Sequence, residues 1–120
     1  MREIKFRGKS EVSGKWCYGN LQIRKDSCCI ITPDESVLGT YGKVDKETVG
    51  QYIGVKDKNG VEIYEGDILR YTYDGKEKID FVEYTWNMFT YHKAVKWDLQ
   101  KDEVIGNIYE NPELLEVEND

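Results

Sequence analysis

Residues 48–69, TVGQYIGVKDKNGVEIYEGDIL, indicate the fold of this chain more strongly than any other stretch. Val, Ile and Tyr recur on both sides of the dipeptide Asn59-Gly60, and these residue types are typical of β-strands. Asn-Gly supplies the two positive φ angles of a type I′ turn, whose twist matches that of two antiparallel strands. The stretch therefore predicts a β-hairpin. After its second strand, Gly66-Asp67 indicates a corner or bulge.

The residues that follow predict a second hairpin. Asp74-Gly75 separates DILRYTY (67–73) from KEKIDFVEY (76–84), so three successive strands are expected to form a meander. In KIDFVEYTW (78–86) apolar side chains occupy both alternating faces. A strand covered on both faces favours a closed barrel, or a sheet packed on a second layer, over an open sheet.

The whole chain follows the same pattern. Short runs of β-branched and aromatic residues are punctuated by 11 glycines, and helical periodicity is almost absent. We therefore predict a mainly β protein, β-rich α+β at most, with less than about 15% helix. The expected strands lie near 3–7, 16–24, 28–32, 48–55, 61–64, 67–73, 77–86, 89–97 and 103–109.

A polar, glycine-bearing segment divides the chain. Residues 32–46, TPDESVLGTYGKVDK, are interpreted as a linker or long loop. We thus expect an N-terminal β-hairpin region with a long loop (1–47), followed by a C-terminal meander with an acidic tail (48–120) that contains a small SH3-like antiparallel barrel. One continuous β-sandwich is the alternative. Asn111-Pro112 predicts a short helical turn near the end.

Length and charge limit the function. A chain of 120 residues is one domain or two small ones. Its 17 Lys and Arg against 23 Asp and Glu give a net charge of -6, opposite to the basic footprint of nucleic-acid binders. No apolar run approaches the roughly 20 residues that cross a bilayer. Residues 1–10, MREIKFRGKS, lack the apolar core of a signal peptide, so we expect a cytoplasmic protein.

The two ends of the chain carry opposite charge. Arg2, Lys5, Arg7 and Lys9 outnumber Glu3 at the N-terminus, whereas the last eleven residues contain five acids and no base. Solvated ends are one interpretation. Attraction between copies is another: an edge strand at residues 4–8 could pair with a second chain, which makes a homo-oligomer an expectation. Weak nucleic-acid binding through the basic end is a further alternative.

Few catalytic groups are recognisable. His92 is the single histidine, and Cys17, Cys28 and Cys29 form no C-x-x-C pair. Neither a phosphate-binding glycine loop nor a complete calcium loop is present. We therefore assign no catalytic residue, metal ligand or cofactor, and regard an enzyme as less well supported than a binding protein. The enzymatic alternative is a site of carboxylates and His92 in a cleft between the two halves.

Aromatic residues are the unusual positive feature. Three Trp, nine Tyr and three Phe serve as core in small β proteins, but Tyr and Trp also mark protein interfaces. Stacking on single-stranded nucleic acid is a third role, which the net charge disfavours. The candidate binding residues are Arg7, Trp16, Tyr18, Tyr52, Tyr64, Trp86 and Tyr91.

Four blocks together resemble one known family, the YopX family of bacteriophage and prophage proteins. They are REIKFRGK (2–9), WCYGNL (16–21), TVGQYIGVKDKNGVEIYEGDIL (48–69) and IGNIYENPELLE (105–116). The resemblance implies a mostly β protein of a phage or prophage in a host bacterial cytoplasm, with no established activity and no catalytic set. Our hypothesis is a non-enzymatic accessory protein that binds an unknown host or phage protein.

Overall fold

The computed structural model describes residues 3–25, 27–32, 40–85, 88–90 and 102–116. Within these ranges the chain forms ten β-strands and one short 3-10 helix, and no α-helix, which confirms the mainly β prediction. The elements are β1 (Phe6–Ser10), β2 (Trp16–Arg24), β3 (Ser27–Thr32), β4 (Thr40–Lys56), β5 (Glu62–Tyr64), β6 (Asp67–Tyr73), β7 (Lys76–Phe81), β8 (Glu83–Thr85), β9 (Met88–Thr90), β10 (Glu103–Asn107) and η2 (Pro112–Leu115).

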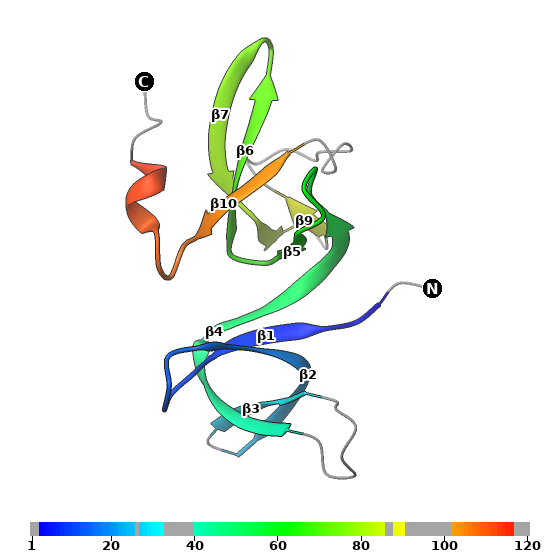
Figure 1. Cartoon of the computed structure of the whole chain (residues 1–120), viewed down its shortest axis with the longest axis vertical. Coiled ribbons are helices and arrows are strands. Elements are labelled where there is room, and N and C mark those ends of the chain that lie inside the picture. Colours follow the sequence, from blue (N-terminus) through cyan, green and yellow to red (C-terminus); the bar gives the residue numbers. More distant parts are fainter. Residues whose placement is uncertain (1–2, 26, 33–39, 86–87, 91–101, 117–120) are drawn as a thin grey trace. The chain divides into compact units, whose positions relative to one another are not determined.

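The chain divides into two compact units, Met1–Tyr52 and Ile53–Asp120. Strand β4 begins in the first unit and ends in the second (Figure 1). Residue 47, at which the sequence suggested a boundary, lies inside this strand. Each unit is described by itself below.

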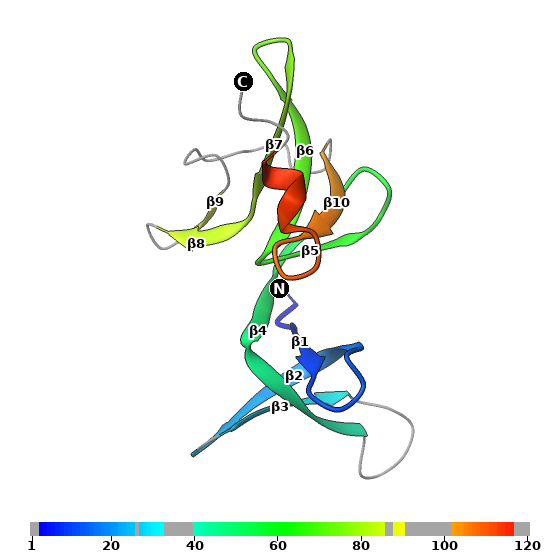
Figure 2. The same ribbon diagram turned by 90° about the vertical axis from the view of Figure 1, so that its left-hand side faces the viewer.

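In the N-terminal unit, four strands close into a ring. Strand β1 pairs with β2, β2 with β3, β3 with β4, and β4 pairs back with β1, all antiparallel. Val44 on β4 completes the circuit, because it lies opposite Ser10 on one side and Cys28 on the other. Figure 2 shows β1 to β4 curling around one another in this unit. The predicted hairpin region is therefore a small closed ring, and β1 has a partner on both sides.

The ring is narrow enough to require glycine at one position. A Cβ built on Gly8 would lie 2.7 Å from a methyl carbon of Val44, closer than non-bonded carbons approach in proteins. Val44 and Ile30 are each only 1% exposed. Gly8 thus gives Val44 the space to fill the ring.

Strand β4 bulges where it passes β1. Arg7 lies opposite Gly50 but Lys9 opposite Asp45, so β4 holds extra residues between these two pairs. The buried Thr48 compensates for the break in the ladder, because its hydroxyl accepts a hydrogen bond from the Lys9 amide (2.9 Å) and donates one to the Asp45 carbonyl (2.6 Å). The bulge therefore leaves the Lys9 amide satisfied.

The C-terminal unit contains short antiparallel sheets, as predicted for a small barrel. Strands β10, β6 and β7 form one sheet in that order, β8 pairs with β9, and β5 pairs with β4. Five buried side chains of this unit, each at most 6% exposed, pack together in one cluster: Ile53, Ile63, Leu69, Tyr71 and Val82. They come from β4, β5, β6 and the break between β7 and β8.

The two predicted hairpins have different turns. Asp74 and Gly75 both have positive φ, 53° and 74°, which confirms the two-residue type I′ turn. The type I′ prediction for Asn59-Gly60 is wrong, because Gly60 has a φ of 82° while Asp74 is the only described non-glycine residue with a positive φ. Instead, the Gly60 amide donates to the Asp57 carbonyl (3.0 Å), which makes a longer turn that ends in a left-handed glycine.

Two further predictions can be compared with the described residues. Part of the loop predicted at 32–46 is wrong, because β4 already begins at Thr40; residues 33–39 lie outside the described ranges. The helical turn after Asn111 is confirmed as η2, with Pro112 as its first residue.

Candidate binding surface

Two neighbouring strands set an aromatic and cationic face on the N-terminal ring. In the β1–β2 register, Arg7 lies opposite Tyr18 and Lys9 opposite Trp16. Residues paired directly across a ladder, and those two apart along a strand, share one face of the sheet. These four side chains therefore occupy the face opposite to that of Gly8, which meets Val44 inside the ring. We call them the β1–β2 face.

The centre of the β1–β2 face is a stacked pair. The guanidinium carbon of Arg7 lies 4.6 Å from the centroid of the Trp16 ring, within the range of a cation–π contact. Arg7 is 6% exposed, whereas Tyr18 beside it is 42% exposed. The pair fixes the Trp16 ring from one side, and Tyr18 is the aromatic group that this face presents to solvent.

A second cation and ring meet nearby on the ladder. The Lys5 Nζ lies 5.7 Å from the centroid of the Tyr52 ring, and the Tyr52 amide donates to the Lys5 carbonyl (2.8 Å). Tyr52 is only 6% exposed, so it serves packing more than surface recognition. The Lys5 ammonium also lies 3.5 Å from a carboxylate oxygen of Glu3.

The other residues proposed from the sequence lie elsewhere. Tyr64 is 1% exposed in the C-terminal unit, and its hydroxyl donates to Oε1 of Glu62 (3.1 Å). Trp86, Tyr91 and His92 lie outside the described residues. The structure thus brings Arg7, Trp16 and Tyr18 together and places Tyr64 in a different unit.

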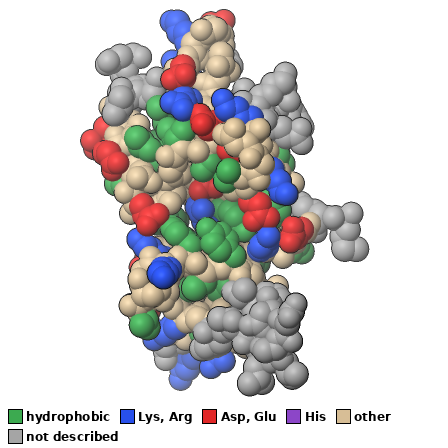
Figure 3. All heavy atoms as spheres, in the orientation of Figure 1, with side chains coloured by type: hydrophobic (Ala, Val, Ile, Leu, Met, Phe, Trp, Pro, Cys, Tyr) green, Lys and Arg blue, Asp and Glu red, His purple; other side chains and the backbone are tan. Residues whose placement is uncertain are grey.

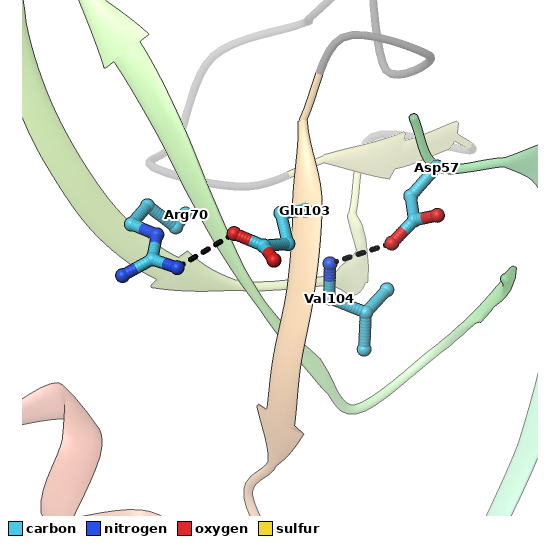
Figure 4. Close-up of polar contacts among 4 residues, drawn as sticks. All are labelled: Asp57, Arg70, Glu103 and Val104. Carbon is cyan, nitrogen blue, oxygen red and sulfur yellow. Dashed lines mark hydrogen bonds and ion pairs between the residues drawn. The ribbon is translucent and has the colours of Figure 1, made fainter. Parts of the chain in front are cut away.

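Asp57, the first residue of the D-x-N-G stretch at 57–60, ties the turn after β4 to β10 in the C-terminal unit. The Asp57 carboxylate is 5% exposed, and its Oδ1 accepts hydrogen bonds from the amides of Asn59 (2.8 Å) and Val61 (2.9 Å). Its Oδ2 accepts one from the Val104 amide (2.9 Å) on β10 (Figure 4). Both oxygens therefore serve the backbone. The D-x-N-G pattern is a signal for the local bonds, but no local signal points to Val104.

An ion pair joins β6 to β10 beside this aspartate. Arg70 lies opposite Glu103 in the ladder, and its Nη2 is 2.6 Å from Oε1 of Glu103 (Figure 4). The hydrogen bond from Arg70 is the largest influence on the Glu103 carboxyl and lowers its pKa below the ordinary value of 4.5, against a smaller opposing effect of desolvation. Both side chains are partly exposed, so the pair is a surface contact.

Among the described residues, pockets open at two turns of the N-terminal unit. The first, of about 490 Å³, lies at the β1–β2 turn and is lined by Lys9, Ser10, Glu11, Gly14 and Asp45, which mix both charges. The second, of about 330 Å³, lies at the β2–β3 turn. No three His, Cys, Asp or Glu side chains of the described residues are arranged to hold a metal ion. In the same part of the chain, no helix has the length and apolar character to span a membrane.

Comparison with known proteins agrees with the sequence resemblance. The family model described as "YopX protein" matches residues 5–116. Among solved structures, the crystal structure of protein EF1440 from Enterococcus faecalis is similar, with a TM-score of 0.64 and 27% identity over 96% of this chain and 99% of that one. No match was found among curated proteins. Because the family model covers both described units almost from end to end, this chain belongs to the YopX family.

Proposed function

We propose that this protein is a non-enzymatic phage or prophage accessory protein, active in the host bacterial cytoplasm, that binds another protein through the β1–β2 face. The observation that carries the proposal is the Arg7 guanidinium stacked on Trp16, with the exposed Tyr18 beside it in register. Trp and Tyr are among the residue types that dominate binding energy at protein interfaces, and the buried Arg7 supports the Trp16 ring from behind this surface.

The face is also held rigid before any partner arrives. Strand β1 is hydrogen-bonded on both sides, to β2 and to β4, and Arg7 restricts the Trp16 ring. An interface that is ordered in advance loses less conformational entropy on binding. Rigid aromatic groups at this position therefore favour recognition of a folded surface or an extended segment.

The non-enzymatic part of the proposal rests on the role of the buried Asp57 carboxylate. Asp57 resembles a catalytic carboxylate in its burial, yet both of its oxygens accept backbone hydrogen bonds. The enzymatic alternative centres on His92, which lies outside the described residues. Nucleic-acid binding through the basic N-terminus has weaker support, because Arg7 is 6% exposed and Lys5 pairs with Glu3.

Capture from host lysate with three matched baits tests the protein-binding proposal. We expect wild-type protein and Val12→Ser to retain the same partner after nuclease treatment, and Tyr18→Ser to lose it. Val12 is a suitable control because it is 94% exposed in the β1–β2 turn and does not belong to the β1–β2 face. Retention of the partner by Tyr18→Ser, or its loss after nuclease treatment, would contradict the proposal.

The phage origin rests on the family resemblance and has a separate test. We expect the transcript to rise when prophages of the host strain are induced by DNA damage, together with transcripts of neighbouring phage genes. A transcript level independent of induction would count against a role in the phage cycle.

A further inference from the structure

The exposed pair Asn59-Gly60, in the turn between β4 and β5, combines the groups for a reaction of the chain with itself. Asn59 offers a carboxamide carbon, and the next residue offers its backbone nitrogen. Glycine leaves that nitrogen accessible because it has no Cβ. A Cβ built on Gly60 would meet no atom within 4 Å, so the space around the pair is open as well. No other asparagine of the sequence precedes a glycine.

The reaction that these groups undergo is deamidation through a cyclic imide. The Gly60 nitrogen gives up its proton to a base in solution and attacks Cγ of Asn59. The new C–N bond closes a succinimide ring, and the C–N bond of the carboxamide breaks as ammonia leaves. Water then opens the ring at either carbonyl, which yields aspartate or isoaspartate. The reaction needs neither an oxidant nor a reductant, because water supplies the incoming oxygen.

Hydrogen bonds of the folded turn oppose this attack. The Gly60 amide donates to the Asp57 carbonyl (3.0 Å), so its nitrogen must first lose that bond. The amides on either side, those of Asn59 (2.8 Å) and Val61 (2.9 Å), donate to Oδ1 of the Asp57 carboxylate. Ring closure requires the backbone between residues 59 and 60 to rotate, and these bonds resist the rotation. The rate should therefore follow the local opening of the turn.

Deamidation adds a negative charge beside a buried one. It replaces a neutral carboxamide with a carboxylate two residues from Asp57, which is 5% exposed. The surrounding unit is already acidic: Ile53–Asp120 contains sixteen Asp and Glu against eight Lys and Arg, whereas Met1–Tyr52 contains seven against nine. Figure 3 shows Asp and Glu side chains on the drawn face of the C-terminal unit. Because like charges repel, the new carboxylate weakens the turn.

The isoaspartate product also lengthens the backbone. The main chain then runs through the former side chain of residue 59 and gains one carbon. The two amides that donate to Oδ1 of Asp57 lie on either side of this insertion, so they cannot both keep their geometry. The other carboxylate oxygen accepts the Val104 amide of β10 (2.9 Å), so a displaced Asp57 loosens its bond to that strand.

We propose that Asn59 is a site of spontaneous deamidation, and that Asp57 couples this modification to the stability of the C-terminal unit. The folded turn slows the reaction, and the isoaspartate product releases Asp57 from Val104. Older copies of the protein therefore become less stable than freshly made ones. The proposal is independent of the protein-binding one, because the β1–β2 face belongs to the other unit.

Peptide mapping by mass spectrometry, after incubation of the full chain in mildly alkaline buffer, tests the site. We expect Asn59 to react in the folded protein, whereas the exposed Asn20, which precedes leucine, does not. In urea, Asn59 should react at least about tenfold faster, because the turn is then open. No reaction at Asn59, equal conversion of Asn59 and Asn20, or equal rates for Asn59 in the folded and the unfolded chain would overturn the proposal.

Asp57→Ala removes the protecting carboxylate and keeps the reacting pair. We expect Asn59 to react at least about fivefold faster in this variant than in wild-type protein. Val82→Ala destabilises the cluster of the same unit away from the turn and should change the rate by less than about twofold. Circular dichroism checks that both variants are folded. An equal rate in Asp57→Ala and wild type would refute the protection by Asp57.

Hydrogen exchange followed by NMR tests the coupling to β10. The Val104 amide should exchange faster in the isolated isoaspartate form than in fresh protein, and the melting temperature of that form should be lower. Asn59→Ser removes the reacting carboxamide, so the same incubation should leave its exchange and its melting temperature unchanged. Unchanged exchange of Val104 in the isoaspartate form, or an equal loss of stability in incubated Asn59→Ser, would contradict the coupling.

Discussion

Single buried polar side chains stabilise the C-terminal unit through hydrogen bonds to its backbone, and Asp57 is the clearest example. Asp57→Asn keeps the shape but places an amide N–H group against one of the three backbone N–H donors. We expect it to lower the free energy of unfolding by about 2–4 kcal/mol, because hydrogen bonds to a buried charge are stronger than neutral ones. Urea denaturation measures the change.

Asp74→Asn is the matched control for this substitution. Asp74 is exposed at the other hairpin turn with a φ of 53°, a conformation that asparagine also adopts. Asp74→Asn should change the free energy of unfolding by less than about 0.5 kcal/mol. Equal effects of the two substitutions would show that the bonds from Asn59, Val61 and Val104 add no stability.

Glycine at position 8 makes the N-terminal ring possible, and substitution tests this directly. Gly8→Ala places a methyl group against Val44, which should cost about 1–3 kcal/mol of stability. Gly42→Ala is the control, because its Cβ would come no closer than 3.4 Å to another atom, the Cys17 sulfur. In the double variant Gly8→Ala/Val44→Ala the loss should be smaller than the sum of the two single losses. Additive losses of stability would show that positions 8 and 44 are not in contact.

At the scale of elements, the β6–β10 ladder makes stability depend on pH. The pKa of Glu103 is lowered in the folded state by the hydrogen bond from Arg70, while Arg70 stays protonated throughout the acid range. The pair therefore stabilises the protein above the ordinary pKa of 4.5, and this contribution disappears as the pH falls through the lower pKa of the folded state.

Glu103→Gln tests this expectation. The variant should have a lower melting temperature than wild-type protein at pH 7, and the difference in melting temperature should shrink as the pH falls below 4.5. Glu113→Gln, at an exposed position of η2 outside this ladder, is the control for the removal of one negative charge. A difference in melting temperature between Glu103→Gln and wild type that stays constant from pH 7 to pH 3 would contradict this role of the Arg70–Glu103 pair.

Local patterns predicted which segments form strands, but not every boundary. The strands at 16–24 and 67–73 were predicted with the bounds that the structure has, because β-branched and aromatic residues recur along them. The start of β4 was missed because TYGKVDK is polar and contains a glycine, and its pairing with β3 is a long-range contact. The turn at Asn59 was assigned the wrong type because Asp57, two residues earlier, supplies the hydrogen bonds that lengthen it.

The candidate site was predictable only in part, because long-range pairing and packing decide which of its residues meet and which are buried. Arg7, Trp16 and Tyr18 were identified by residue type, and a β1–β2 hairpin brings them together. Burial of Tyr52 and Tyr64 depends on the packing of each unit, which residue type does not reveal. Lys46 of β4 lines the pocket at the β2–β3 turn, and no local sequence signal places it beside β2.

At the scale of the whole molecule, the uneven charge bears on self-association. The suggestion from sequence was that β1 is an unpaired edge, and this premise is wrong because β1 pairs with both β2 and β4. Attraction between the basic Met1–Tyr52 of one copy and the acidic Ile53–Asp120 of another remains. We therefore expect a homo-oligomer that salt dissociates, since exposed charges more than about 10 Å apart are screened at 0.1 M.

Light scattering at several salt concentrations tests this expectation. The mass should exceed 14.0 kDa at low salt and fall to 14.0 kDa at high salt. A mass of 14.0 kDa at low salt and high protein concentration would rule out the oligomer. A larger mass that salt does not change would point to apolar contacts instead.

The closed ring also dictates an order of events in time. Strands β1 and β2, and likewise β2 and β3, are joined by short turns and can pair as soon as they have left the ribosome, whereas the pairing of Phe6 with Gln51 must wait for β4. The β1–β4 pairing is therefore the last to form, and until then the amides that it protects exchange with water. Pulsed hydrogen exchange during refolding should show protection of the β1–β2 and β2–β3 ladders before the β1–β4 ladder, and simultaneous protection would mean that the ring closes in one step. The N-terminal strand thus closes the ring only after residues synthesised some forty positions later have returned to it.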